Sequence, residues 1–217
     1  MPRDANNARN GSNEIPPSHP SHPSHPSHEP ERLLPPRGDY RTLLSFQKAE
    51  LVYDITFRFA HKVLAKGDRT IDQMIQSARS GKKNILEGSK AALTSKETEI
   101  KLTNVARASL EELLADYRDF LRNRGLEEWT KDHPYARRPS QLNRQPDASY
   151  GTLRKGIEHT DPAICANVII GLIKVATYLL DRQIARLETD FVEKGGLRET
   201  MTRVRLAQRN KNQRRSS

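Results

Sequence analysis

Three basic side chains at helical spacing are the first candidates for binding chemistry. Arg79, Lys83 and Lys90 fall within about 40° of one another when residues advance by 100° around a helix. Such a stripe can hold a phosphate backbone, with an affinity that falls as the salt concentration rises. No aromatic side chains alternate with it, so we expect contacts to the backbone rather than to bases. The candidate nucleic-acid-binding residues are Arg79, Lys82, Lys83, Lys90, Lys101, Arg107, Arg203 and Arg205.

The positive charge of the chain is concentrated in two segments. The formal net charge is +10, to which residues 40–124 contribute +5 and residues 197–217 contribute +6. A basic excess of this kind favours polyanions, usually nucleic acid. The alternative is a surface that only keeps the protein in solution. We favour the polyanion interpretation because the charge is localised.

No catalytic constellation is apparent in the sequence. It has no Gly-rich phosphate loop, no nucleophile elbow and no zinc-protease histidine pair. A di-iron centre in a helical bundle needs Glu-x-x-His motifs, and no Glu is followed by His three residues later. Glu87, Glu111, Glu112 and Asp116 would be the candidate acids, but ordinary carboxylates are the better interpretation. We therefore predict that the chain is not an enzyme and has no catalytic residues and no cofactor.

Metal binding is not expected either. The triplet Ser-His-Pro repeats through residues 18–26, and proline at every third position favours polyproline II. Successive histidines would then be about 9 Å apart, too far for two of them to share one ion. A low-complexity extension is the better interpretation. Cys165 is alone and is expected to be buried, and no signal peptide is apparent at the start, so we expect a cytoplasmic protein.

Hydrophobic periodicity predicts three helices joined by short turns. They span about residues 43–64, 70–93 and 94–124, and the last stops at Gly125. Small residues on the second helix, at positions 78 and 81, should let a neighbour approach closely. The predicted caps are Ser45 for the first helix and the capping boxes Thr70 with Gln73 and Thr94 with Glu97 for the next two.

A long apolar helix follows a connection at residues 125–160, which is either functional or disordered. The helix begins at Asp161-Pro162 and ends at Gly195-Gly196. Its apolar run of 18 residues would suit a membrane span, but Lys174 near the middle and Asn167 argue against one. We favour a central helix, or one shared with another subunit.

The predicted fold is all-α, an up-down four-helix bundle with a disordered N-terminal extension and a basic C-terminal tail. The domains are a His/Pro/Ser-rich extension at 1–39, the bundle at 40–196 and the tail at 197–217, whose end should be flexible. The third and fourth long helices carry more apolar surface than one bundle buries. This surplus predicts a homo-oligomer.

Three motifs resemble a known family. Residues 84–88 (Asn-Ile-Leu-Glu-Gly) are similar to its Asn-Ile-x-Glu-Gly segment, and residues 106–113 to its Ala-x-x-Ser-x-x-Glu-Leu stretch. Residues 46–49 (Phe-Gln-Lys-Ala) resemble its first helix. The family comprises four-helix-bundle proteins encoded in ribosomal RNA intervening sequences and the accessory protein of diversity-generating retroelements. The resemblance covers about residues 43–124 and, more loosely, 161–191.

This resemblance implies a left-handed four-helix bundle and a homo-oligomer, a pentamer in the best-known relatives. In the retroelement branch it implies a basic, nucleic-acid-binding surface and a reverse transcriptase partner. The connection and the tail depart from the family and suggest a distinct subfamily. We therefore expect a non-enzymatic oligomeric accessory factor that binds nucleic acid, RNA or DNA, and does not bind a membrane. The alternative is a protein-interaction scaffold with no nucleic-acid role.

Overall fold

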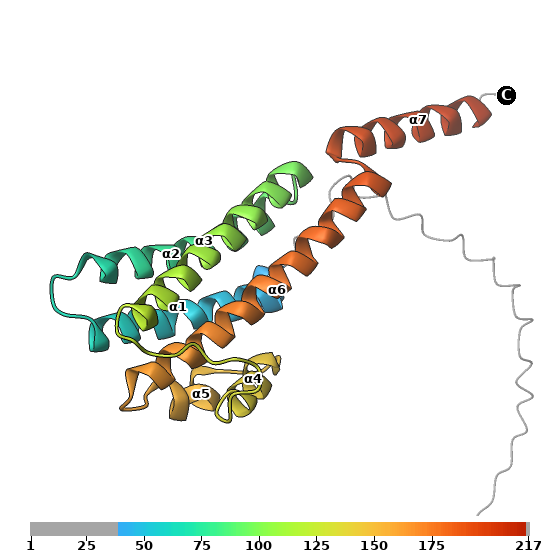
Figure 1. Cartoon of the computed structure of the whole chain (residues 1–217). Helices are drawn as coiled ribbons and strands as arrows, with labels where there is room; N and C mark the ends of the chain where they lie inside the picture. Colours follow the sequence, from blue (N-terminus) through green and yellow to red (C-terminus); the bar gives the residue numbers. More distant parts are fainter. Residues whose placement is uncertain (1–38, 216–217) are drawn as a thin grey trace, which may run out of the picture. The chain divides into compact units, whose positions relative to one another are not determined.

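The computed structural model describes residues 39–215, and this part of the chain is all-α, with no strand (Figure 1). The extension predicted to be disordered, residues 1–39, lies outside the described residues except for Asp39, and residues 216–217 lie outside them too. The elements are a 3-10 helix at Tyr40–Thr42 and the helices α1 (Leu44–Val63), α2 (Arg69–Ala91), α3 (Lys96–Arg122), α4 (Arg137–Arg144), α5 (Tyr150–Ile157), α6 (Pro162–Lys194) and α7 (Leu197–Arg215).

Four long helices, α1, α2, α3 and α6, share one hydrophobic core. α2 packs against α1 and α3, and α6 packs against the same two helices, α1 and α3. Ser45 Oγ at the start of α1 donates to Gln183 Oε1 in the second half of α6 at 2.6 Å. Lys62 Nζ at the end of α1 donates to the carbonyl oxygen of Glu158, shortly before α6, at 3.5 Å. α1 and α6 are therefore antiparallel.

The approach of α2 to α3 is close because glycines of α2 face it. A Cβ atom added at Gly81 would lie 2.7 Å from Leu110 Cδ2, and one at Gly88 would lie 3.3 Å from Leu102 Cβ. Position 81 thus faces position 110, and position 88 faces position 102, so these two helices are antiparallel as well. Close packing at position 81 agrees with the prediction made from its small size.

The N-caps of α1, α2 and α3 differ from the predicted caps by one or two residues, whereas α6 begins at Asp161-Pro162 as predicted. Ser45 is not a cap: it lies inside α1 and is buried, and the N-cap residue is Leu43, which has no side-chain cap. α2 is capped by Asp68, whose Oδ1 accepts from the backbone N–H of Thr70 at 2.9 Å. The predicted capping box at Thr70 and Gln73 is therefore wrong.

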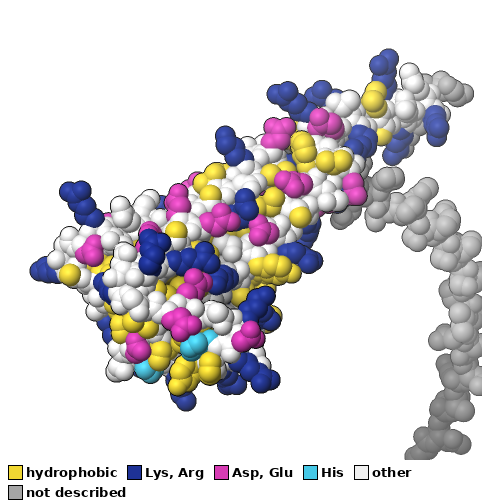
Figure 2. All heavy atoms as spheres, in the orientation of Figure 1, with side chains coloured by type: hydrophobic (Ala, Val, Ile, Leu, Met, Phe, Trp, Pro, Cys, Tyr) yellow, Lys and Arg dark blue, Asp and Glu magenta, His cyan; other side chains and the backbone are white. Residues whose placement is uncertain are grey.

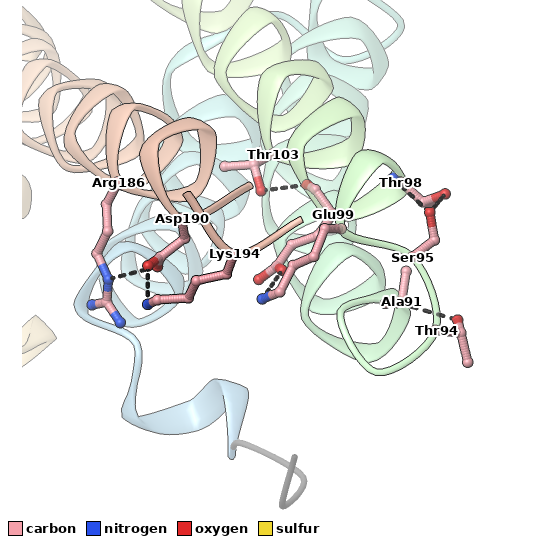
Figure 3. Close-up of polar contacts among 10 residues, drawn as sticks. Ala91, Thr94, Ser95, Thr98, Glu99, Thr103, Arg186, Asp190 and Lys194 are labelled. Atoms are coloured by element: carbon pink, nitrogen blue, oxygen red, sulfur yellow. Dashed lines mark hydrogen bonds and ion pairs between the residues drawn. The ribbon is translucent and has the colours of Figure 1, made fainter. Parts of the chain in front are cut away.

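The start of α3 is shown in Figure 3. Ser95 is the N-cap, and its Oγ accepts from the backbone N–H of Thr98 at 3.1 Å. The predicted capping box at Thr94 and Glu97 is wrong, since Thr94 Oγ1 instead donates back to the carbonyl oxygen of Ala91 at 3.2 Å. The end of α3 agrees with the prediction, because Gly125 adopts a positive φ of 65° just beyond it.

The connection at 125–160 folds onto α6 through the short helices α4 and α5. Figure 1 shows both of them beside the end at which α6 begins. Asn143 of α4 donates to the carbonyl oxygen of Val168 at 3.2 Å, and a Cβ at Gly156 of α5 would lie 2.9 Å from Val168 Cγ2. Leu153 and Ile157 are buried in the core. The connection is therefore an ordered part of the structure.

This packing changes the argument for a surplus of apolar surface. Cys165 and the residues that follow it up to Ile170 are all buried within the single chain. On α3, Leu110 and Leu121 are also buried. The apolar surface of the first half of α6 is thus largely covered by the chain itself, because α4 and α5 pack on it, while α3 packs against α2 and α6.

Within the described residues, one helix is long and apolar enough to cross a membrane. A window of 18 residues between Pro162 and Arg214 has a mean hydropathy of 2.0, and 56% of it is buried inside the protein. A core helix of a water-soluble protein has the same length and composition, so this is weak evidence for a membrane span.

The last turns of α6 are held by charge pairs. Asp190 accepts a hydrogen bond from Lys194 and lies 3.8 Å from Arg186 Nε (Figure 3). Gly195, with a φ of 72°, ends the helix as predicted. α7 is helical as far as Arg215, although the end of this segment was expected to be flexible, and none of its described side chains is buried.

Candidate nucleic-acid interface

The outer face of α2 presents three of the predicted basic residues. Arg79, Lys83 and Lys90 are exposed, and none of them forms an ion pair or hydrogen bond with another described residue. They lie opposite the side of α2 that enters the core, because 3.6 residues per turn separate the two sets by about half a turn. The buried residues of that other side are Met74, Ala78, Gly81, Ile85 and Gly88.

Lys82 is engaged by the protein. Its Nζ lies 4.3 Å from the centre of the Tyr53 ring and 3.8 Å from Glu50 Oε1, both on α1. The neighbouring Lys83 points to solvent, since consecutive helical residues are 100° apart. Lys82 therefore supports the contact between α1 and α2 and is a weaker candidate for a ligand contact.

Of the two predicted residues of α3, one is unpaired and the other is paired with carboxylates. Lys101 is exposed and makes no contact to a described partner, and it lies beside Leu102, which faces Gly88 of α2. Arg107 lies 3.6 Å from Glu111 and 3.3 Å from Asp181 of α6. The charge of Arg107 is thus neutralised within the protein, while Lys101 has no described partner.

The predicted residues of α7 are both exposed. Arg203 donates to the carbonyl oxygen of Lys194 at 3.0 Å, while Arg205 has no described partner. Figure 2 shows Lys and Arg side chains along α7, whereas on the visible face of the long helices they alternate with Asp and Glu. Five of the eight predicted residues are therefore free cations: Arg79, Lys83, Lys90, Lys101 and Arg205.

The candidate acids do not gather into one site. Glu111 pairs with Arg107, and Glu87 is exposed on α2. Burial, together with the nearby carboxylates of Asp119 and Glu112, raises the pKa of Asp116 above its ordinary value. No group of three or more His, Cys, Asp or Glu side chains that could hold a metal ion occurs in residues 39–215.

The motif residues that carry the family resemblance serve helix packing. Asn84 donates to the carbonyl oxygen of Ser80 at 3.0 Å, and the Ser80 hydroxyl shares a hydrogen bond of 2.9 Å with Ser109 of α3. Gly88 approaches the carbonyl oxygen of Glu99. Two of the motifs therefore meet at the contact between α2 and α3, and this is a structural role.

Sequence reasoning missed a cavity of about 690 Å³ beside α6. Its walls include Trp129, Arg144 and the buried Asn143, all of which lie in the connection at 125–160. The one tryptophan of the chain, placed in a polar connection with several prolines, was the signal that this segment packs against something.

No family model, curated protein or solved structure matches this chain. The family resemblance therefore rests on the three short motifs alone.

Proposed function

We propose that this chain is a non-enzymatic, cytoplasmic accessory protein that binds nucleic acid through a basic strip. The strip is defined here as Arg79, Lys83, Lys90 and Lys101. We propose further that the four long helices form an up-down bundle of the family that the motifs resemble, and that α7 adds a second basic element.

The observation that carries this proposal is the freedom of the four cations. Each is exposed and lacks an acidic partner among the described residues. Other surface cations, such as Lys82 and Arg107, are paired with carboxylates. Binding of a phosphate backbone to the strip would release counterions, which drives association without any loss of internal ion pairs.

A titration with labelled RNA and DNA at several salt concentrations tests the proposal. We expect binding at low salt whose affinity falls steeply as salt rises. A variant with all four strip residues changed to glutamine should bind nucleic acid more weakly. Its affinity should also depend less on salt concentration, because about four phosphate contacts are lost. The strip residues are exposed, so the variant should unfold at the same temperature as the wild type.

The matched control removes four free cations elsewhere. Lys66, Arg138, Lys155 and Arg182 are exposed and have no described partner. Changing these four to glutamine alters the net charge equally but leaves the strip intact. If both variants lost the same affinity for nucleic acid, binding would depend on the overall charge and not on the strip. Absence of binding by the wild type at low salt would refute the proposal.

We also propose that the protein is a homo-oligomer. Support comes from the family resemblance, which implies a pentamer, and from exposed apolar side chains such as Val192, which is 83% exposed, and Leu206, which is 54% exposed. Light scattering is the direct test. A mass of 24.7 kDa in solution would mean a monomer and would refute this part of the proposal.

A scaffold for other proteins is the second candidate function. The exposed side chains of Phe57 and Tyr178 favour it, since large apolar groups at the surface are typical of protein contacts. The resemblance implies a reverse transcriptase as one such partner. Partners that remain bound after nuclease treatment would favour the scaffold, and partners that are lost would favour nucleic-acid binding.

A further inference from the structure

The cavity beside α6 has the dimensions of a small-molecule site. Its volume of about 690 Å³ falls within the usual range for such sites, which is about 300–1,000 Å³. One wall is α6, with Ile170 and Val175, and another is the start of α1, with Leu44. The connection at 125–160 supplies a further wall, and the cavity opens to solvent.

The charged side chains that line this cavity are all cationic. They are Lys48, Lys131, Arg144 and Lys174, and no Asp or Glu is among the lining residues. Lys131 and Arg144 have no described partner, whereas Lys174 is paired with Glu128 at 2.7 Å. A cavity with this lining attracts an anion, because an anion would neutralise cations that the protein leaves free.

Lys48 is the unusual member of the set. It is only 1% exposed, and its Nζ donates to the carbonyl oxygen of Gln145. Burial lowers its pKa, although the negative charge of Asp147 acts in the opposite direction. An ammonium group has three N–H donors. An anion in the cavity would therefore provide an acceptor for a buried cation that has one described hydrogen bond.

The cavity also has a buried acceptor that lacks a donor. Asn143 is fully buried, and its Oδ1 has no hydrogen-bond partner. Its Nδ2 donates to the carbonyl oxygen of Val168 at 3.2 Å, which fixes the orientation of the amide. A buried acceptor without a partner costs about 1–3 kcal/mol. A ligand with an N–H group would supply the missing donor.

An aromatic wall stands next to these polar groups. The backbone N–H of Trp129 donates to Asn167 Oδ1 at 2.7 Å, and the Asn167 amide donates to the carbonyl oxygen of Glu127 at 2.9 Å. The Trp129 ring stacks on His133 at 5.0 Å between ring centres. Trp129 lies in the connection between α3 and α4, and its backbone is thus tied to α6 through Asn167.

We propose that this cavity binds a nucleoside monophosphate. The phosphate would lie among Lys48, Lys131 and Arg144, and the base would pack on Trp129 and offer an N–H donor to Asn143. A nucleotide combines the three properties that the cavity selects: an anionic group, a flat ring and ring-edge N–H donors. This ligand site is separate from the basic strip on α2 and α3.

Fluorescence of Trp129 reports binding directly, because the chain contains one tryptophan. AMP, GMP, CMP and UMP would each be titrated into the full-length protein, with adenosine, ribose 5-phosphate and inorganic phosphate as probes that lack one part. We expect at least one nucleotide to change the emission and to bind at least tenfold more tightly than its nucleoside and than ribose 5-phosphate, a difference of about 1.4 kcal/mol. Equal affinity for a nucleotide and either fragment would overturn the proposal, as would the absence of any saturable change.

Exposed residues provide variants that keep the fold. Arg144→Gln and Lys131→Gln should each weaken nucleotide binding by about tenfold, because a hydrogen bond to a charged group is lost. Arg138→Gln is the matched control, since it changes the same helix at an exposed position that does not line the cavity. Equal loss in Arg138→Gln and Arg144→Gln would overturn the proposed location.

A second comparison separates this site from the proposed function. The variant without the basic strip should bind the nucleotide as the wild type does, and Arg144→Gln should bind long RNA or DNA as the wild type does. If the strip variant loses both ligands, the cavity is not a separate site and the inference fails. If the wild type does not bind long nucleic acid but does bind the nucleotide, the inference stands and the proposed function fails.

Discussion

At Gly81, α2 and α3 approach so closely that a methyl group has no room. A Cβ there would lie 2.7 Å from Leu110 Cδ2 and 2.8 Å from Cγ, and Leu110 is fully buried. The glycine thus sets the spacing of two helices, and any larger residue must displace a core side chain. At residue scale, the sequence showed that position 81 is small but could not show which side chain it faces.

We expect Gly81→Ala to destabilise the protein by about 1–3 kcal/mol, because overpacking outweighs the gain in helix propensity of about 1 kcal/mol. Gly151→Ala is the control, since its Cβ would have one ordinary contact at 3.7 Å to Ser149 Oγ. Urea unfolding measures both. A Gly81→Ala protein as stable as the Gly151→Ala protein would contradict the close approach.

Glu128 joins α3 to α6 by accepting hydrogen bonds from Arg118 Nε at 3.0 Å and from Lys174 Nζ at 2.7 Å. Burial acts to raise the pKa of Glu128, but the hydrogen bonds from Lys174 and Arg118 outweigh burial and hold it below its ordinary value of 4.5. The stabilisation from a lowered acid pKa is present above the ordinary pKa and disappears as pH falls through the lowered one.

We therefore expect Glu128→Gln to lower the free energy of unfolding by about 1 kcal/mol at pH 7. The difference from the wild type should shrink as pH falls below the ordinary pKa of 4.5 and vanish once the carboxyl is protonated in both states. Glu127→Gln, an exposed neighbour without an ion pair, should have little effect at either pH. A deficit for Glu128→Gln that stays constant with pH would mean that the charge is not responsible.

At the scale of the elements, capping was the least predictable feature. Sequence patterns favoured Thr94 as the start of α3, whereas Ser95 accepts the hydrogen bond from Thr98. Ser and Thr are both favourable caps in isolation, so the choice between two adjacent ones depends on where the preceding turn places the chain. The ends of α3 and α6 were predictable because glycine is the residue that readily adopts a positive φ.

Ser95→Ala should cost about 1 kcal/mol of stability, since the N–H of Thr98 loses its acceptor. Thr94→Ala should cost less, because its hydroxyl only donates to an exposed turn. Thermal unfolding followed by circular dichroism compares the two variants. If Thr94→Ala were the more destabilising change, the cap assignment would be wrong.

At the scale of the whole molecule, the connection at 125–160 is the decisive segment. It covers the first half of α6, links α3 to α6 through Glu128, and forms one side of the cavity that we propose as a ligand site. The prediction of an oligomer depended on apolar surface of α3 and α6, and this segment covers the first half of α6. The oligomer now depends on the family resemblance and on a few exposed apolar side chains.

Leu153→Ala tests whether the connection belongs to the core. Leu153 is 2% exposed and lies in α5, so removal of its side chain should cost about 3 kcal/mol. Leu206→Ala on α7, where the side chain is 54% exposed, is the matched control and should be close to neutral. A neutral Leu153→Ala variant would show that α5 contributes nothing to the stability of the fold.

The sequence by itself determined the helical class, the extent of the four long helices and the outward direction of Arg79, Lys83 and Lys90. These follow from local periodicity, which depends only on the 3.6-residue repeat and on turn residues such as Gly125. Only the tertiary structure decided that Lys82 and Arg107 are paired, that α4 and α5 cover α6, and that Lys48 and Asn143 share one cavity. Those features join residues far apart in the chain, such as Arg107 with Asp181, and no local pattern records which distant partner a side chain meets.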